Sequence, residues 1–371
     1  MLPTGPFRLG DAMPKIDVRK EMPAVKLTRE QFSHRMREQF YDPVFDPLKQ
    51  DIDKIIDVAW DAYDKSRKSP RTQKAGPSYA DPNYDLSIEW IEASRKIKEA
   101  QSRQKDAASP SRVLIINGAA RSEHTCSGES SKSWRLASIA REVFEQEKGL
   151  EIELLDLSRI TSEYGRNIHP CKTCVSTAMP LCHWPCSCYP NHALGQVHDW
   201  MNDIYPMWTA AHGVMIINPV NWCQAPSVLK LMIDRLVCAD GGNPDPTSTQ
   251  GKKPELAKKL ELDGWPYPRH LAGRVFSLVV HGDSTGARGV KASLADWLTD
   301  IGLIEAGHLS QVDAYIGYME PYATSHEALD KDTALQEETR NAARSLVQAV
   351  KQMRNGELKP PDRNLREPRP K

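Results

Sequence analysis

Residues 113–117 read VLIIN and are followed by Gly118 and a polar loop. Side chains of this run are apolar up to Asn117, which is typical of a strand buried on both faces of a parallel sheet. Two similar, largely apolar runs follow at 213–218, GVMIIN, and at 275–281, VFSLVVH. Helical patterns of apolar residues separate the three runs. These three strands are therefore expected to form the centre of the fold.

The segment around these runs alternates expected strands and expected helices. Strands are predicted at 113–117, 151–157, 213–218, 275–281 and 303–314. Helices are predicted at 131–147, 199–211, 226–237, 289–301 and 332–353. Two neighbouring parallel strands need a crossover connection, and here each connection is helical. This order predicts an α/β fold with a doubly wound, five-stranded parallel sheet.

Composition divides the chain into three expected parts. Residues 1–110 are predicted to form a helical extension, and residues 111–355 the α/β domain. Within that domain we distinguish a cysteine-rich loop, 171–188, and an insertion, 239–262. The tail, 356–371, is rich in proline and charge and is predicted to be disordered.

The extension carries two signals for helix starts. Thr28 with Gln31 three residues later has the form of a capping box. Asp46 followed by Pro47 offers an N-cap with proline at the first helical position. A further helix is expected at 85–100.

The overall composition excludes several classes of protein. The chain has 371 residues, with 49 Lys and Arg against 49 Asp and Glu. Zero net charge does not favour nucleic acid as a partner. No apolar run approaches the roughly 20 residues that cross a bilayer, and the first residues lack the apolar core of a secretory signal. We therefore expect a cytoplasmic protein whose eight cysteines are thiols or metal ligands.

The loop after the first strand is rich in hydroxyl groups and precedes a helix. In open α/β sheets, ligands bind beyond the carboxyl ends of the strands, and a helix N-terminus attracts phosphate. Arg121 and Lys132 add positive charge. The loop is neither a P-loop nor a dinucleotide fingerprint, and the alternative is that it only caps the helix. The candidate phosphate contacts are Gly118, Arg121, Ser122, Thr125, Ser131 and Ser133.

The segment 218–235 reads NPVNWCQAPSVLKLMIDR and carries a more specific signal. It resembles the NADPH-dependent FMN reductase family of flavodoxin-like proteins, in which Pro-Val-Tyr precedes a helix with Lys-x-x-x-Asp-Arg. The matching residues are Pro219, Val220, Lys230, Asp234 and Arg235. The resemblance implies a flavodoxin-like domain, and it implies flavin contacts at Pro219, Val220, Asn221 and Trp222.

The loop after the fourth strand, 280–286, reads VHGDSTG. By the same resemblance, His281, Gly282 and Asp283 lie at the pyrimidine edge of the flavin. The alternative for His281 is a structural histidine. The first loop departs from the family pattern, since Ala119 replaces a serine there.

Five cysteines gather in the cysteine-rich loop: Cys171, Cys174, Cys182, Cys186 and Cys188. A C-x-x-C pair is a natural chelate for zinc or an iron–sulfur cluster. The loop partly resembles that of iron–sulfur flavoproteins, although Thr177 stands where that branch has its third cysteine. Two hypotheses therefore remain, a bound metal and reduced thiols with a structural or redox role.

The resemblance implies an FMN-dependent NAD(P)H oxidoreductase. Electrons would pass from NAD(P)H to a quinone, an azo or nitro compound, a flavin or a similar small acceptor. FMN supplies the chemistry, so no catalytic side chain is assigned. The alternatives are an iron–sulfur flavoprotein and a flavodoxin-type carrier that does not itself oxidise NAD(P)H. Family members are commonly dimers or tetramers, and we expect the extension to wrap a neighbouring subunit or, alternatively, its own domain.

Overall fold

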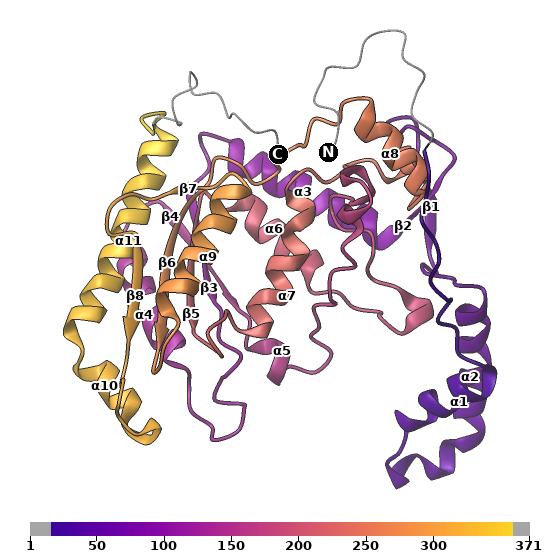
Figure 1. Cartoon of the computed structure of the whole chain (residues 1–371), viewed down its shortest axis with the longest axis horizontal. Helices are drawn as coiled ribbons and strands as arrows, with labels where there is room; N and C mark the ends of the chain where they lie inside the picture. Colours follow the sequence, from indigo (N-terminus) through magenta and orange to yellow (C-terminus); the bar gives the residue numbers. More distant parts are fainter. Residues whose placement is uncertain (1–15, 359–371) are drawn as a thin grey trace.

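A parallel sheet organises the computed structural model, in which residues 16–358 are described (Figure 1). Its strand order is β4-β3-β5-β6-β7, and β8 also pairs with β6. The strands are β3 (Ser111–Asn117), β4 (Leu150–Asp156), β5 (Gly213–Pro219), β6 (Val275–Gly282), β7 (Ile304–Glu305) and β8 (Gln311–Tyr315). All strand pairs of this sheet are parallel. The prediction of a doubly wound α/β fold is confirmed.

The edge of the sheet differs from the prediction. A single strand was expected at 303–314, but β7 and β8 are separate strands. Between them, Gly307 and Leu309 have φ angles of 96° and 71°. Left-handed backbone cannot continue a strand, so the chain turns there and resumes pairing with β6 further along.

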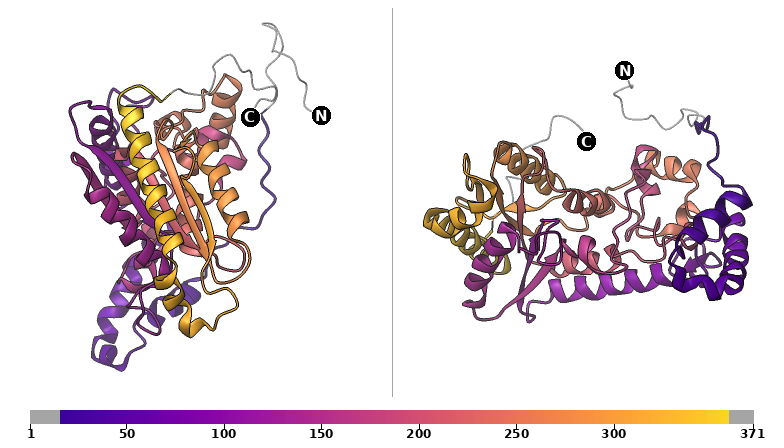
Figure 2. Two further views of the ribbon diagram at one scale, coloured as in Figure 1. Left: turned by 90° about the vertical axis from the view of Figure 1, so that its left-hand side faces the viewer. Right: turned by 90° about the horizontal axis from the view of Figure 1, so that it is seen from below.

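Helices cover both faces of the sheet (Figure 2). On one face, α4 (Lys132–Glu145) and α11 (Thr333–Arg354) bury Leu136 and Leu346 against Ile115. On the other face lie α6 (Met201–Ala210), α7 (Ser227–Arg235) and α9 (Ala287–Asp300). Strands buried on both faces explain the unbroken apolar runs of the sequence.

The extension begins with α1 (Arg29–Glu38), η1 (Pro43–Leu48) and α2 (Lys49–Asp64). The capping box of Thr28 and Gln31 is present. The helix start expected at Asp46 is wrong, because η1 begins earlier, where Asp42 accepts a hydrogen bond from the Val44 amide. The same Asp-Pro pattern occurs at 42–43, and this upstream copy is the one that caps a helix.

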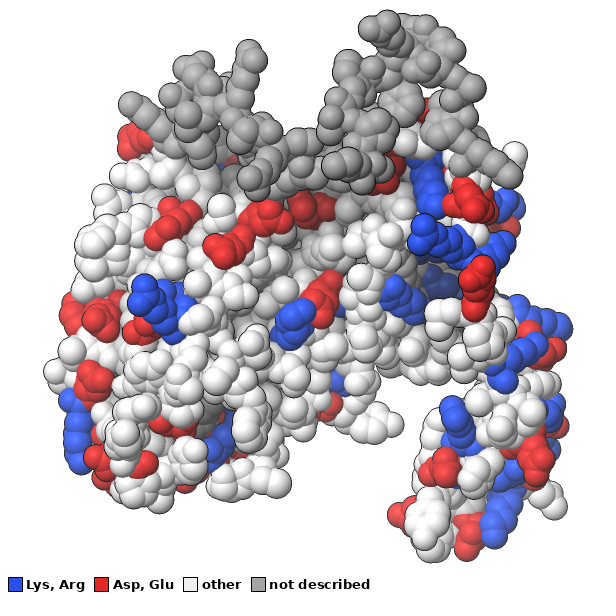
Figure 3. Space-filling model, viewed as in Figure 1, with Lys and Arg blue, Asp and Glu red and all other residues white. Residues whose placement is uncertain are grey.

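Helices α1 and α2 form an arm that stands away from the main body (Figures 1 and 3). They pack around a small cluster of their own, Phe32, Ile52 and Ile56. A two-stranded antiparallel ribbon follows, β1 (Thr72–Lys74) with β2 (Asp85–Ser87). Helix α3 (Ile88–Lys105) then runs along the body, as Figure 2 shows from below. Its Trp90 Nε1 donates to the Pro185 carbonyl at 2.9 Å, so α3 belongs to the body rather than to the arm.

The cysteine-rich loop and the insertion pack together into one lobe. The amide of Trp184 donates to the Asn243 carbonyl at 2.8 Å, and the Asn243 amide donates to the Cys182 carbonyl at 2.7 Å. Short helices in this lobe are η2 (Cys174–Ser176), η3 (Met179–Leu181), η6 (Pro246–Thr249) and α8 (Pro254–Leu262). The short helix η4 (His192–Leu194) follows the cysteine-rich loop, and η5 (Leu236–Ala239) leads from α7 into the insertion. Elsewhere lie α5 (Arg159–Ser162), η7 (Tyr322–Thr324) and α10 (Ser325–Lys331).

The described chain ends shortly after α11. Most of the tail predicted to be disordered, from residue 359 onward, lies outside the described residues. Within residues 16–358, no helix combines the length and the hydrophobicity needed to span a lipid bilayer.

Candidate functional site

Three loops meet at the carboxyl edge of the sheet, the lower edge in Figure 1. A Cβ atom on Gly118 would lie 2.7 Å from the Cβ of Asn218, so the loops after β3 and β5 approach more closely there than a side chain permits. The Val220 amide donates to the His281 carbonyl at 2.8 Å and ties the loop after β5 to β6. The predicted convergence of the three loops is thus present in the fold.

A polar pocket of about 170 Å³ lies between the ends of β3 and β4 and the start of α4. Three of the predicted phosphate contacts, Arg121, Ser122 and Ser131, line it. The pocket is also lined by Ser130, Ser158, Arg159 and Ser162, and by the carboxylates of Glu123 and Asp156. Hydroxyl groups and guanidinium groups are donors, which suits an anion at a helix N-terminus.

The first turn of α4 contains two predicted serines with different roles. Ser131 caps the helix, because its Oγ accepts a hydrogen bond from the Trp134 amide at 3.1 Å. The Oγ of Ser133 instead lies 2.7 Å from Nε2 of His281, and both side chains are buried. The hydroxyl of Ser133 is therefore engaged inside the protein, and its backbone amide is the group left for a ligand.

The ring of His281 is buried and hydrogen-bonded to Ser133 in this geometry. Burial, helped by the positive charge of Lys132, lowers its pKa to about 3. The imidazole is therefore neutral at physiological pH and accepts or donates one hydrogen bond to Ser133. The resemblance placed it at the flavin edge, whereas its ring faces the interior; its backbone carbonyl holds Val220.

The loop after β3 is shaped by its own side chains. The Oγ1 of Thr125 accepts from the Ser122 amide at 3.2 Å and donates to the Ser122 carbonyl at 2.7 Å. Thr125 thus folds the loop and does not line the pocket. Arg121 contacts Ser127 at 2.7 Å and Glu129 at 2.9 Å, yet its Nε is buried without a partner. That unpaired donor is available to a bound anion.

The loop after β5 contains a tight turn. Asn221 and Gln224 exchange two backbone hydrogen bonds, of 2.9 and 3.0 Å. The two residues between them, Trp222 and Cys223, have φ angles of 49° and 60°, the conformation of a type I′ turn. Trp222 is consequently 98% exposed and projects from the rim of the site, while Pro219 and Val220 lie half-buried at its base.

The loop after β6 lies against this turn. A Cβ on Gly282 would lie 3.4 Å from the Cβ of Val220, and one on Gly286 would lie 2.9 Å from the Cα of Cys223. The Asp283 carboxylate lies 3.9 Å from Nζ of Lys132. Burial lowers the pKa of Lys132, and Asp283 opposes that shift. Lys132, suggested by the sequence only as added charge, is therefore held between the first and third loops.

Polar residues at the strand ends are the part of the site that sequence reasoning missed. The Nδ2 of Asn117 donates to Oδ1 of Asp156 at 2.8 Å, and the Ser158 hydroxyl donates to the same oxygen at 2.8 Å. Asn117 and Asp156 are the last residues of β3 and β4 and both line the pocket. The sequence feature that could have identified these residues is a polar residue at the end of an apolar run.

A family comparison decides the identity of this domain. The sequence model of the NADPH-dependent FMN reductases matches residues 111–314, over half of the chain. This chain belongs to the NADPH-dependent FMN reductase family. It is accordingly an NAD(P)H-dependent flavin oxidoreductase with FMN as its cofactor, and small molecules are the substrates of the family.

Solved structures similar to this FMN reductase family member include RosB and two azoreductases. RosB with a bound intermediate has 14% identity and a TM-score of 0.43, over 67% of this chain and 82% of its own. The azoreductase AzrA has 14% identity and a TM-score of 0.39, over 63% and 99%. The azoreductase from Bacillus anthracis has 13% identity and a TM-score of 0.36, over 63% and 98%. No curated protein matches the sequence.

The residues at the carboxyl edge fit FMN. The polar pocket accommodates an anionic group and offers the unpaired Nε of Arg121. Because Gly118 has no Cβ, the ends of β3 and β5 approach each other closely at Asn218, which brings the backbones of the two loops together at this edge. The buried Oδ1 of Asn218 lacks a partner in the protein and suits a ring N–H donor.

The hypothesis of a metal in the cysteine-rich loop is not supported. Among the described residues, no group of three or more His, Cys, Asp or Glu side chains is placed to hold a metal ion. Cys182, Cys186 and Cys188 are instead buried among apolar side chains of the main core. The iron–sulfur cluster or zinc ion expected at Cys171, Cys174, Cys182, Cys186 and Cys188 is therefore withdrawn, and these cysteines are free thiols.

Proposed function

We propose that this protein passes electrons from NAD(P)H to a small planar acceptor, such as a quinone, an azo or nitro compound or a flavin. One observation carries the proposal. A polar pocket and an exposed aromatic side chain, Trp222, stand at opposite ends of one set of converging loops. Such a site suits a cofactor with an anionic tail and a flat ring, with a second flat molecule beside it.

At the anionic end, α4 and its preceding loop would bind the phosphate. Ser131, Arg121 and the free backbone amides of the first turn of α4 are the donors. Ser122 and Thr125 keep the loop in shape, because their hydrogen bonds are internal to it. These assignments rest on the pocket and on the unpaired Nε of Arg121.

At the ring end, the loops after β5 and β6 would position the flavin. Pro219, Val220 and Asn221 offer backbone and apolar contacts, while Gly282 and Asp283 close the other edge. Bound FMN supplies hydride acceptance from the nicotinamide and electron transfer to the acceptor. The protein contributes orientation and the exclusion of water, and His281, being neutral and buried, keeps Ser133 in place.

Exposed aromatic side chains favour a planar acceptor. Tyr315 is the register neighbour of Gly282 across β8 and β6, and its ring centroid lies 5.4 Å from that of Tyr318. Tyr318 and Tyr322 are also exposed. Tyr315, which pairs with Gly282, and Trp222 offer stacking surfaces to an aromatic compound beside the loops of the site.

A visible spectrum of the purified protein, recorded before and after addition of NADPH, tests the proposal. We expect flavin absorption that is bleached within seconds by NADPH and restored by a quinone. Bleaching only through a partner reductase would instead identify an electron carrier. A preparation that neither contains nor takes up FMN would refute the proposed site.

The assembly and the compartment are further parts of the proposal. We propose a homodimer or homotetramer in which the arm contacts a neighbouring subunit, because Val44, Ile55 and Val58 of the arm are exposed.

Residues 1–110 are proposed as the extension and 111–355 as the FMN-binding domain. The cytoplasm is the proposed compartment, because reducing conditions keep a cysteine-rich loop in the thiol form.

A further inference from the structure

Two cysteines of the lobe face each other. The Sγ of Cys174 lies 3.6 Å from the Sγ of Cys188. The C-x-x-C spacing suggested Cys171 and Cys174 as a metal chelate, but the Sγ of Cys171 accepts a hydrogen bond from the Thr173 amide at 3.3 Å. Cys174 begins the short helix η2 and is partly exposed, whereas Cys188 is only 8% exposed. One thiol of the pair is thus accessible and the other lies behind it.

The insertion supplies a positive charge to this pair. Nζ of Lys252 lies 3.8 Å from the Sγ of Cys174 and donates to the Leu181 carbonyl at 2.6 Å. Both contacts aim the ammonium group inward from the surface of the lobe. A cation beside a thiol favours the thiolate, which is the nucleophilic form. This contact gives a role to Lys252, a basic residue of the insertion that the flavin site does not use.

A pocket lined by three cationic side chains and by the carboxylate of Asp85 is linked to the pair through Lys252, which lines the pocket and contacts Cys174. It has a volume of about 460 Å³ and is lined by Arg67, Lys68, Lys252, Ser187 and Tyr189 among others. Ser187 and Tyr189 flank Cys188 in the sequence. Among the described residues, Lys68 has no side-chain hydrogen bond or ion pair, and burial lowers its pKa. An unpaired, half-buried lysine is a binding group for an anion.

The thiols of the lobe differ in reactivity. The hydrogen bond from Cys188 and the charge of Lys252 lower the pKa of Cys174 to about 6. Burial raises the pKa of Cys182 and of Cys238. Cys174 is therefore the thiolate of the cluster at neutral pH, and the deeply buried thiols are unreactive.

We propose that Cys174 and Cys188 form a dithiol–disulfide exchange site that reacts with small anionic disulfides. In the first step the Cys174 thiolate attacks one sulfur of the disulfide, forming a mixed disulfide and releasing one thiolate. In the second step the Cys188 sulfur attacks Sγ of Cys174 and displaces the second thiolate, while the Cys188 proton passes to a leaving thiolate. The two cysteines together lose two electrons, and the small disulfide gains them.

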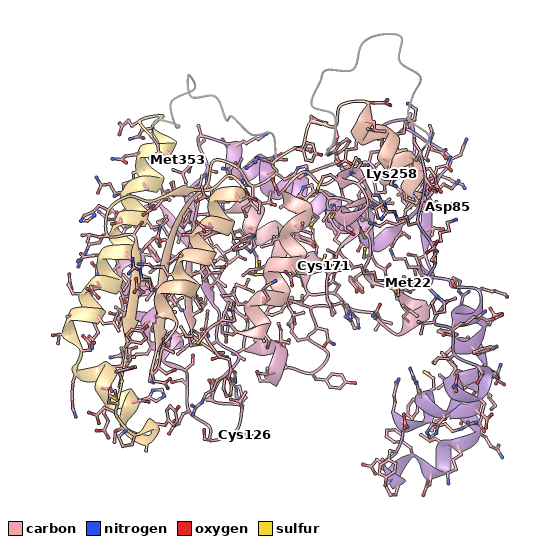
Figure 4. The ribbon with its side chains drawn as sticks, viewed as in Figure 1. Met22, Asp85, Cys126, Cys171, Lys258 and Met353 are labelled. Atoms are coloured by element: carbon pink, nitrogen blue, oxygen red, sulfur yellow. The ribbon has the colours of Figure 1, made fainter. Side chains whose placement is uncertain are left out.

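The exchange site is separate from the flavin site. Figure 4 shows Cys126, in the loop after β3, at the lower end of the molecule and Cys171 near the middle. Neither Cys174 nor Cys188 lies in the three loops of the flavin site. The test therefore uses the FMN-loaded protein without NAD(P)H, so that its result does not depend on flavin turnover.

Peptide mapping after exposure to glutathione disulfide tests the pairing. We expect a Cys174–Cys188 disulfide in the wild-type protein. Cys188→Ser should stop at a mixed disulfide of Cys174 with glutathione, and Cys174→Ser should give neither product. Cys171→Ser is the matched control and should leave the Cys174–Cys188 bond intact. A Cys171–Cys174 bond in the wild-type protein, or no intramolecular bond, would overturn the proposal even if a variant failed to fold.

The charge preference is tested with three disulfides. Glutathione disulfide is anionic, 2-hydroxyethyl disulfide is neutral and cystamine is cationic. We expect the anionic compound to react fastest, with an advantage of about 10-fold that shrinks as salt is added. Lys68→Gln should remove most of this advantage and leave the rate with the neutral disulfide unchanged. Equal rates with all three compounds would contradict an anion-binding role for the pocket.

Discussion

The Oγ of Ser133 and Nε2 of His281 lie 2.7 Å apart in the interior and join the first turn of α4 to the end of β6. This contact ties the loop that would bind the phosphate to the loop that would border the flavin ring. Because burial, together with the positive charge of Lys132, lowers the pKa of His281 to about 3, the imidazole stays neutral although it lies next to the site. The main consequence of this neutral, buried imidazole is a loss of stability in acid.

We expect the protein to lose stability as the pH falls below about 6.5. The folded-state pKa of His281 is about 3 and that of His212 about 4, both lowered mainly by burial. Unfolded histidines take up protons near pH 6.5, so the unfolded state binds more protons below that value. The free energy of unfolding should then fall by about 1.4 kcal/mol per pH unit for the fully buried His281, until its folded-state pKa is reached. His212 should contribute less in total, because its folded-state pKa is lowered less, to about 4.

Urea unfolding at pH 7.5, 6.5 and 5.5 measures this loss. The His281→Asn variant should show a smaller decrease between these pH values than the wild-type protein. His34 is exposed on the arm, so His34→Asn is the control and should keep the wild-type pH dependence. An equal decrease in all three proteins would show that other groups cause the acid sensitivity.

A substitution of Gly118 should weaken FMN binding. In Gly118→Ala the new Cβ would lie 2.7 Å from the Cβ of Asn218, so the loops after β3 and β5 must separate. Overpacking of this kind costs about 1–3 kcal/mol, and 1.4 kcal/mol corresponds to a 10-fold loss of affinity. Titration of FMN followed by flavin fluorescence measures the dissociation constant.

The matched control for Gly118 is Gly289. Gly289 lies in α9, and a Cβ added there would have no neighbour within 4 Å, so Gly289→Ala meets no obstacle. Alanine is the better helix former by about 1 kcal/mol, and the control should bind FMN normally and be slightly more stable. Equal FMN affinity in the two variants would mean that the close approach at Gly118 has no role in binding.

Much of the fold follows from local patterns of the sequence. Strands such as β3 and β5 were predictable because burial on both faces demands unbroken apolar runs. The break between β7 and β8 was not, because Leu309 adopts a left-handed conformation that its residue type does not announce. Likewise, the Asp46-Pro47 pair lies inside η1 and caps no helix, and only the folded chain shows that Asp42 caps η1.

The convergence of the three loops was predictable from the sequence, but their side-chain contacts were not. Strand ends and loop composition located the three loops, whereas the engagement of Ser133 with His281 depends on how α4 packs beside β6. The contact between Cys174 and Cys188 was likewise not predictable from the sequence. Cys174 and Cys171 are close in sequence, but Cys174 faces Cys188, because the lobe folds back on itself.

Removal of the Trp222 ring should weaken acceptor binding without unfolding the protein. The side chain is 98% exposed, so Trp222→Ala should change the free energy of unfolding by less than about 0.5 kcal/mol. Loss of an aromatic stacking partner costs about 1 kcal/mol, and the KM for a quinone should rise about 5-fold. Tyr41→Ala, an exposed aromatic of the arm, is the control and should leave KM unchanged. An unaltered KM in Trp222→Ala would remove this residue from the acceptor site.

A change in the arm should alter the oligomeric state. Ile55 and Val58 are apolar and exposed on α2, so a glutamate at both positions should weaken a contact with a neighbouring subunit. Light scattering of the full-length double variant is expected to give a smaller mass than that of the wild-type protein. Lys54→Glu changes charge on the same helix and should leave the mass unchanged. An unchanged mass in the double variant would favour an arm that belongs to its own subunit alone.

Asp199 and Asp234 each pair with a basic residue of α7. Replacing Asp199 with Asn should lower the free energy of unfolding much more than the same change at Asp234. Arg235 and Asp199 are both buried, with Nη2 and Oδ2 2.5 Å apart, and Nη1 of Arg235 also donates to the His169 carbonyl at 2.9 Å. Asp199→Asn leaves the guanidinium without its counter-charge inside the protein, so the free energy of unfolding should drop by about 3–5 kcal/mol. Asp234 pairs with Lys230 on the exposed side of the same helix, and Asp234→Asn should cost less than about 1 kcal/mol. Urea unfolding of the two variants at pH 7.5 provides the comparison. Similar losses would show that the burial of Arg235 does not determine the strength of its pairing.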